Sequence, residues 1–194
     1  MRNARESGYA AYAFDFDGTL ADTTDLNHHA VQASLASHGI GVPLTWVAAH
    51  PAFTAPQLRR RLGLGPAELP DDTFVEAARN YWFAHTDRIR PITAAATAAR
   101  TAAQHAAVAV VTTNYGDIVR HGLTVVALDD LPWTIVARED VQQTKPAPDP
   151  YLYAARLLKV APHACLAHED TDEGITSARA AGMDVIDIRQ RTWR

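Results

Sequence analysis

The chain has 194 residues, of which 47% are hydrophobic and 21% are charged, and its formal net charge is -4. This length and composition suffice for one sizeable core with a small appended domain, and they exclude a disordered or fibrous protein. The acidic balance gives no general attraction to nucleic acid, and the arginine run at 59–61 is short and typical of a solvated helix face.

The single cysteine, Cys165, excludes an internal disulfide and lies in an apolar run, where we expect a buried strand thiol. The N-terminal segment has no apolar stretch long enough for a signal peptide. No apolar run approaches the roughly 20 residues that span a membrane. We therefore expect a cytoplasmic protein with neither a membrane nor a nucleic-acid partner, and we expect a monomer or a weak homodimer.

Short apolar runs alternate with helical patterns along the chain. The runs predict strands at residues 10–16, 107–111, 134–137, 164–167 and 185–188. Helices are expected at 93–107, which is rich in alanine, at 151–159 after Asp149-Pro150, and at 171–181 before Gly182. Such alternation predicts an α/β fold in which crossover helices connect the strands of a parallel sheet.

Residues 23–90 interrupt this alternation, because they contain helical patterns but no convincing strand. Helices are expected at 30–38, at 57–62 and after a capping box formed by Thr73 and Glu76. We therefore predict an inserted all-helical module at 23–90. The core domain would then consist of residues 1–22 and 91–194.

The first predicted strand ends in Asp15-Phe16-Asp17-Gly18-Thr19-Leu20, which places two carboxylates two positions apart. In open α/β sheets the carboxyl edge of the strands holds the ligand, because the loops there can surround it. An isolated Asp-x-Asp would be better interpreted as an acidic turn. The motifs later in the sequence favour a ligand-binding site at this position instead.

The second strand ends in Thr112-Thr113-Asn114, just before a predicted helix. A hydroxyl and free backbone N–H groups at a helix N-terminus bind phosphate, although the same residue types also cap helices for structural reasons. Lys145 is one of two lysines in the chain and stands in a proline-braced loop. Its compact ammonium is suited to bridging a carboxylate and a phosphoryl oxygen.

A second pair of acids, Glu169 and Asp170, follows the fourth predicted strand. If the strands are neighbours, these acids crowd against Asp15 and Asp17. Two like charges about 4 Å apart repel by roughly 4 kcal/mol at an effective dielectric of about 20, so the cluster needs a cation. Carboxylate oxygens suit Mg²⁺, whereas zinc is disfavoured because no cysteine or histidine cluster accompanies them.

These motifs, in this order, strongly resemble those of the haloacid dehalogenase superfamily of phosphotransferases. The resemblance spans nearly the whole chain. It is closest to the β-phosphoglucomutase-like sugar phosphatases, at residues 15–23, 145–149 and 169–175. It implies a Rossmann-like parallel sheet core and makes the helical insert at 23–90 a cap that closes over the site.

The resemblance implies that Asp15 is a nucleophile that forms an aspartyl-phosphate, and that Asp17 protonates the leaving oxygen and then activates water. The chemistry agrees, because a carboxylate attacks phosphorus competently when a metal neutralises the developing charge. The resemblance assigns Thr112 and Lys145 to the phosphoryl group, with Thr113 a possible substitute for Thr112, and we expect Asn114 of the same helix N-terminus to help bind the phosphate. The implied Mg²⁺ ligands are Asp15, Asp17 through its backbone carbonyl, Asp170 and Glu169.

The sequence departs from the mutases of the family at positions that set specificity. Thr54 and Asn27 stand where mutases carry a cap arginine and a histidine, although His28 could replace the histidine. Tyr115 stands where a lysine would help to hold a second phosphate. Because a mutase must hold two phosphates, these losses favour a hydrolase.

We therefore expect a Mg²⁺-dependent phosphomonoesterase that acts on a small, sugar-like phosphate ester. The alternatives are a phosphosugar mutase and a catalytically silent binding protein with the same fold. A dehalogenase has no need for Asp17, a phosphonate-cleaving enzyme needs a lysine within 23–90, and a kinase needs a glycine-rich phosphate loop that the sequence lacks.

Overall fold

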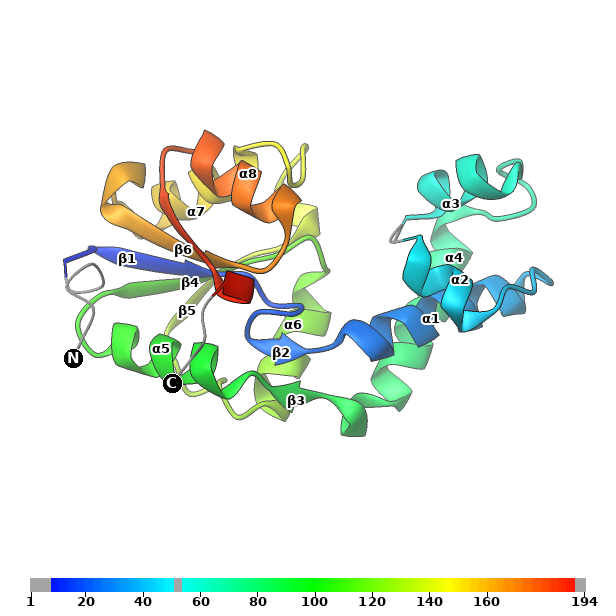
Figure 1. Ribbon diagram of the computed structural model, residues 1–194, viewed down its shortest axis with the longest axis horizontal. Helices are drawn as coiled ribbons and strands as arrows, with labels where there is room; N and C mark the ends of the chain where they lie inside the picture. The colour runs from blue at the N-terminus through cyan, green and yellow to red at the C-terminus, as the bar shows by residue number, and fades with distance from the viewer. Residues whose placement is uncertain (1–7, 51–53, 191–194) are drawn as a thin grey trace. The chain divides into compact units, whose positions relative to one another are not determined.

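The computed structural model describes residues 8–50 and 54–190 (Figure 1). The predicted domains also include residues 1–7, 51–53 and 191–194, which lie outside the described residues. The chain divides after Asp22 and after Ile89 into two compact units. We call the α/β part the core unit and residues Thr23–Ile89 the helical unit.

The core unit contains a five-stranded sheet in the order β5-β4-β1-β6-β7. Its strands are β1 (Ala11–Phe14), β4 (Ala107–Val111), β5 (Trp133–Val136), β6 (Cys165–Glu169) and β7 (Asp184–Asp187). Every neighbouring pair is parallel, which confirms the predicted sheet. The expected strand ends are wrong by one or two residues: β1 stops at Phe14, and β6 continues to Glu169.

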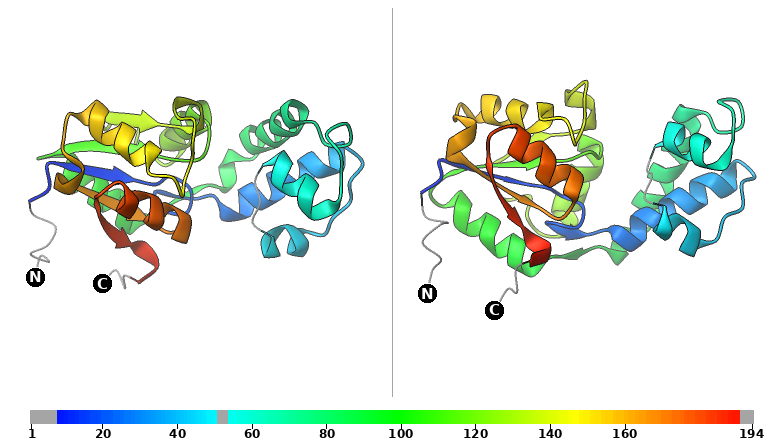
Figure 2. Two further views of the ribbon diagram at one scale, coloured as in Figure 1. Left: turned by 90° about the horizontal axis from the view of Figure 1, so that it is seen from above. Right: turned by 45° about the horizontal axis from the view of Figure 1, so that its top comes forward.

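Four helices connect these strands. They are α5 (Thr93–Ala103), α6 (Gly116–Val125), α7 (Asp149–Leu158) and α8 (Asp172–Ala180), and short 3₁₀ turns lie at Arg138–Asp140, Pro162–Ala164 and Ile188–Gln190. Helices α7 and α8 cover one face of the sheet and α5 covers the other (Figures 1 and 2). The predicted helix at 93–107 is too long, because the chain turns after Ala103 to begin β4 at Ala107.

The alternation of side chains along β1 explains how the two faces differ. Ala11 and Ala13 pack in the same buried cluster as α7 and α8, and their small size lets those helices lie close to the sheet. Tyr12 and Phe14 therefore point to the opposite face, where the Phe14 ring stacks on His168 at 4.4 Å between centroids. Cys165 is buried at the start of β6, as expected.

Helix α8 ends by the predicted glycine mechanism. Gly182 has φ +84°, its N–H bonds to the carbonyl of Arg179, and the N–H of Met183 bonds to the carbonyl of Ala178. This pair of bonds is a Schellman motif, which needs a left-handed residue at the position that Gly182 occupies. The motif turns the chain sharply toward β7.

The helical unit consists of α1 (Thr24–Ser37), α2 (Leu44–Ala49), α3 (Ala55–Leu62) and α4 (Asp71–Ala84), followed by a 3₁₀ turn at Thr86–Arg88. It has its own apolar core, which includes Leu35, Leu58 and Phe74. The helices predicted at 30–38 and 57–62 are confirmed as parts of α1 and α3, whereas α2 was not predicted.

The predicted capping box at Thr73 is wrong. Helix α4 begins at Asp71, so Thr73 lies in its first turn, with its hydroxyl oxygen 2.8 Å from His38 Nε2. The carboxylates of Asp71 and Asp72 face the positive end of the helix dipole, which favours the earlier start.

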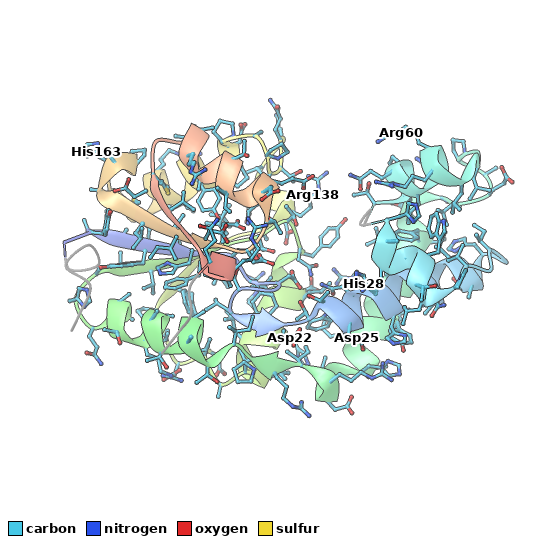
Figure 3. The ribbon with its side chains drawn as sticks, viewed as in Figure 1. Asp22, Asp25, His28, Arg60, Arg138 and His163 are labelled. Carbon is cyan, nitrogen blue, oxygen red and sulfur yellow. The ribbon has the colours of Figure 1, made fainter. Side chains whose placement is uncertain are left out.

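The arginine run of α3 is exposed as expected at Arg60, which Figure 3 labels, and at Arg61. Arg59 differs from its two neighbours because it is only half-exposed and its Nη1 lies 3.1 Å from Asp71 Oδ1. The run therefore combines an exposed face with one ion pair inside the helical unit.

The chain passes between the two units at a pair of two-residue strands that the sequence did not predict. Strands β2 (Ala21–Asp22) and β3 (Arg90–Pro91) are antiparallel, and Ala21 lies opposite Pro91. The two segments that join the core unit to the helical unit therefore pair with each other within the core unit. Within residues 8–50 and 54–190, no helix has the length and apolar character needed to cross a membrane.

Candidate active site

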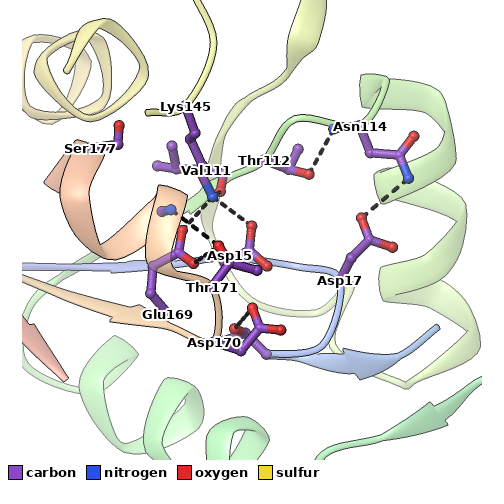
Figure 4. Close-up of polar contacts among 12 residues, drawn as sticks. Asp15, Asp17, Val111, Thr112, Asn114, Lys145, Glu169, Asp170, Thr171 and Ser177 are labelled. Atoms are coloured by element: carbon purple, nitrogen blue, oxygen red, sulfur yellow. Dashed lines mark hydrogen bonds and ion pairs between the residues drawn. The ribbon is translucent and has the colours of Figure 1, made fainter. Parts of the chain in front are cut away.

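The order of the strands brings distant parts of the sequence to one edge of the sheet. Strand β1 lies between β4 and β6, and all three run in the same direction. The residues at their carboxyl ends, Asp15, Thr112 and Glu169, therefore gather at the same edge (Figure 4). This is the edge at which open α/β sheets bind ligands.

Lys145 makes the central contacts of this edge (Figure 4). Its Nζ donates to Asp15 Oδ1 at 2.6 Å, to Glu169 Oε1 at 2.5 Å and to the carbonyl of Val111 at 2.8 Å. The relative exposure is 8% for Lys145, 7% for Asp15 and 0% for Glu169. An ammonium has three donors, so each N–H of Lys145 has an acceptor within the protein.

Glu169 is held by further donors that the sequence analysis missed. The hydroxyl of Tyr151 donates to Glu169 Oε1 at 2.6 Å, and the hydroxyl of Thr171 donates to Oε2 at 3.2 Å. Lys145 Nζ also lies 5.3 Å from the centroid of the Tyr151 ring. Both oxygens of the Glu169 carboxylate therefore have partners within the core unit.

Asp170 lies against the loop that follows β1. The Thr19 hydroxyl donates to Asp170 Oδ1 at 3.2 Å. Gly18 has φ +80°, and a Cβ atom there would overlap the Asp170 carboxylate. A Cβ atom at Gly174 would likewise overlap the carboxylate of Glu169. Glycine is thus required at both positions to let the backbone pass this close to the two acids.

Asp17 and the loop after β4 form the third part of the site. Asn114 Nδ2 donates to Asp17 Oδ2 at 3.2 Å, and the N–H of Asn114 donates to Thr112 Oγ1 at 2.9 Å. Thr112 is buried, whereas Thr113 is exposed. The geometry therefore brings Asn114 to Asp17, and of the two threonines it is Thr112 that faces inward.

Burial and mutual repulsion perturb the charges at this edge. Burial raises the pKa of Asp15 well above its ordinary range, although the Lys145 charge acts against this rise. Burial lowers the pKa of Lys145, but the carboxylates of Asp15 and Glu169 outweigh it, so Lys145 stays protonated. Burial and the Glu169 charge raise the pKa of Asp170 to about 6, and they also raise that of Tyr151, which stays a neutral donor.

The donor set fits a hard divalent cation. Asp15, Glu169 and Asp170 each offer an oxygen atom, and these atoms lie within 4.8 Å of one another. Lys145 supplies one positive charge against three carboxylates, so excess negative charge remains at the cluster. A bound cation would offset this charge and would lower the pKa of Asp15 and Asp170.

The remaining predicted positions belong to different parts of the chain. Tyr115 is the residue just before α6 in the core unit and is half-buried. Thr54 precedes α3, and Asn27 lies on α1, so both belong to the helical unit. Tyr115 itself carries no positive charge, but the Arg120 guanidinium of α6 lies close to Gly116, the next residue along the chain.

Similarity to known proteins covers nearly the whole chain. Fructose-1-phosphate phosphatase YqaB of Escherichia coli is 30% identical over 186 residues, which are 93% of this chain and 97% of that protein. Protein CbbY of Rhodobacter capsulatus is 30% identical over 194 residues, which cover 91% of this chain and 83% of that protein.

The solved structures agree. CbbY from Rhodobacter sphaeroides in complex with phosphate matches with a TM-score of 0.79 at 26% identity, and the match covers 91% of this chain and 84% of that chain. The haloacid dehalogenase-like hydrolase family matches residues 12–188. By these matches and by the parallel sheet that carries the acidic edge, the chain belongs to the haloacid dehalogenase-like hydrolase family.

Proposed function

We propose that this chain, a phosphatase of its family, is a Mg²⁺-dependent phosphomonoesterase that acts through an aspartyl-phosphate on Asp15. One observation carries the proposal. The buried Asp15 carboxylate lies 2.6 Å from the Lys145 ammonium, and an oxygen of Asp15 lies within 4.8 Å of one from Asp170. A carboxylate so placed has both the fixed orientation and the nearby positive charge that attack on phosphorus requires.

The reaction has two balanced steps. In the first, an oxygen of Asp15 forms a bond to phosphorus, the ester P–O bond breaks, and Asp17 gives its proton to the leaving oxygen. In the second, water attacks phosphorus and transfers a proton to Asp17 while the bond to Asp15 breaks. Inorganic phosphate leaves, and both carboxyl groups return to their starting states.

Lys145 and Thr112 are the proposed contacts of the phosphoryl group. The Lys145 ammonium already bonds to Asp15, so negative charge that develops on a phosphoryl group attached to Asp15 would be next to it. The Thr112 hydroxyl accepts a bond from the Asn114 N–H and keeps its own proton for donation. Thr113 stays the alternative to Thr112.

The proposed Mg²⁺ ligands are Asp15, Asp170 and the backbone carbonyl of Asp17. When bound, the ion supplies charge neutralisation of the transferring phosphoryl group. Glu169 has partners at both of its oxygens, which favours a role in holding Lys145 over a role as a metal ligand.

The proposed substrate is a small sugar phosphate, and the helical unit is the proposed cap that selects it. Support for this class comes from the fructose-1-phosphate phosphatase that matches 93% of the chain. Hydrolysis is favoured over mutase activity because Thr54, Asn27 and Tyr115 supply no cation for a second phosphate. The expectation of a cytoplasmic monomer or weak homodimer stays a prediction.

The test is hydrolysis of an aryl phosphate and of a panel of sugar, nucleotide and short-acid phosphates, with and without Mg²⁺. We expect Mg²⁺-dependent phosphate release that Asp15→Asn abolishes and that Asp129→Asn, a change at an exposed aspartate, leaves intact. A phosphoryl label sensitive to hydroxylamine should appear on the peptide that contains Asp15. Isomerised sugar phosphate without released phosphate would identify a mutase, and no turnover of any ester would favour the silent binding protein.

A further inference from the structure

We propose that Asn114 is a positioning residue that orients the carboxylate of Asp17 for proton transfer to the leaving group. This inference rests on the proposed phosphatase function and adds a component to it. Asn114 Nδ2 donates to Asp17 Oδ2 at 3.2 Å, across 97 positions of sequence (Figure 4). The sequence analysis grouped Asn114 with the phosphate-binding residues, and the proposal gives its side chain a different task.

The orientation of the Asn114 amide follows from its other contact. Its Oδ1 accepts a hydrogen bond from the N–H of Tyr115 at 2.9 Å. A backbone N–H can only donate, so the oxygen of the amide must lie on that side. The NH₂ group must therefore face Asp17, which makes the contact with Oδ2 a donor-to-carboxylate hydrogen bond.

The backbone of Asn114 is fixed as firmly as its side chain. The Asn114 N–H donates to Thr112 Oγ1 at 2.9 Å, and its carbonyl accepts from the N–H of Arg138 at 2.9 Å. Arg138, labelled in Figure 3, belongs to the 3₁₀ turn after β5, so two loops of the core unit hold this residue. A donor whose own position is determined this completely can fix the position of its acceptor.

Asp17 needs such a support because it stands in a loop. It follows β1 by three positions and precedes Gly18, whose φ is +80°. A general acid must lie within hydrogen-bond reach of the oxygen that it protonates, so a carboxyl group free to rotate would spend much of its time misdirected. A carboxylic acid carries its proton on one oxygen, and the Asn114 N–H at Oδ2 favours Oδ1 as that oxygen, because Oδ2 already accepts a hydrogen bond.

The leaving group provides a test that a merely structural role would not pass. A 4-nitrophenyl leaving group departs without a proton, whereas the alkoxide of an alkyl or sugar phosphate needs one. For Asn114→Asp, which keeps the size and the acceptor for Tyr115 but replaces the donor, we expect kcat/KM for the alkyl ester to fall about 10-fold to 100-fold more than for 4-nitrophenyl phosphate. Asp17→Asn should show the same selectivity, and the double variant should lose little beyond Asp17→Asn alone.

Asn80→Asp is the matched control, since it makes the same chemical change at an exposed position of α4. If Asn114→Asp fails to fold in a thermal melt, Asn114→Ser takes its place, because a serine hydroxyl can still accept from the Tyr115 N–H. Equal losses with both esters, together with weaker inhibition by inorganic phosphate, would assign Asn114 to phosphate binding and overturn the inference alone. Absence of any hydrolysis by the wild-type protein that depends on Asp15 would instead overturn the proposed function, and the inference with it.

Discussion

Replacing Lys145 by methionine removes the one ammonium that two buried carboxylates share. Lys145 Nζ lies 2.6 Å from Asp15 Oδ1 and 2.5 Å from Glu169 Oε1, and both acids are buried. Methionine preserves most of the length and apolar volume of the side chain. The variant therefore tests charge and hydrogen bonding with little change in packing.

The expected loss is large because both carboxylates stay buried. At 2.6 Å and an effective dielectric of about 20, one such pair is worth about 6 kcal/mol of attraction before desolvation is subtracted. Breaking a buried pair by removing one partner costs about 3 to 5 kcal/mol of folding free energy. For a chain of this size, a loss of that order lowers the melting temperature by about 6 to 20 °C.

The loss should depend on pH with a definite sign. Burial already raises the pKa of Asp15 above its unfolded value, and removal of the Lys145 charge raises it further. The native state of the variant then binds a proton that the unfolded state releases, so its stability falls as pH rises. Destabilisation relative to wild type should accordingly be greater at pH 7 than at pH 5.

The assay is thermal and denaturant unfolding of Mg²⁺-free protein at both pH values. Lys159→Met is the matched control, because Lys159 is the other lysine and is exposed. Glu169→Gln added to Lys145→Met should restore part of the stability by neutralising one of the two acids. Two results would show that the buried pair does not hold this edge together. One is a free energy of unfolding for Lys145→Met within about 1 kcal/mol of that for Lys159→Met at pH 7, and the other is a difference between the two variants that is the same at pH 5 and pH 7.

The remaining predictions concern the residues around this pair. Because the pKa of Asp170 is raised to about 6 in the metal-free fold, from an unfolded value near 3.8, stability without metal should fall by about 2 to 3 kcal/mol as pH rises from 4 to 7. Mg²⁺ should therefore raise the melting temperature more at pH 7 than at pH 5, and an equal rise would contradict this. Gly174→Ala should lower the free energy of unfolding by about 1 to 3 kcal/mol and should lower kcat at least tenfold, because the added methyl group displaces Glu169. Gly41→Ala should change neither quantity, because no atom lies close to the position of its methyl group. Tyr151→Phe should cost about 1 to 3 kcal/mol in denaturant unfolding, since Glu169 loses a buried donor, and an unchanged midpoint would count against that hydrogen bond.

The parallel sheet could be predicted from the sequence because its three central strands, β1, β4 and β6, are short and largely apolar segments that are buried on both faces of the sheet. The elements that could not be predicted lack such a local signal. Strands β2 and β3 have two residues each and exist only because Ala21 and Pro91 pair across the insertion. Helix α2 is six residues long, which is too short for a helical period to appear in the sequence.

Part of the site could be predicted for the same kind of reason. Acids at the ends of strands are visible in the sequence, and a parallel sheet must bring those ends to one edge, so the meeting of Asp15, Glu169 and Asp170 follows from the pattern. Tyr151 gives no such signal, because a single aromatic residue in the first turn of α7 is typical of ordinary packing. Only the packing of α7 against the sheet brings its hydroxyl to Glu169.

Asn114 marks the limit of what the motif can predict. A sequence motif indicates which residue types meet at the edge of the sheet, but each polar side chain has a fixed number of donors and acceptors, and the neighbours decide how they are used. Because the Tyr115 N–H fixes the side on which the amide oxygen lies, the NH₂ group faces the site, and Asp17 lies within its reach. The same loop can therefore bind phosphate through Thr112 and orient the general acid through Asn114, because the two side chains point to different parts of one small volume.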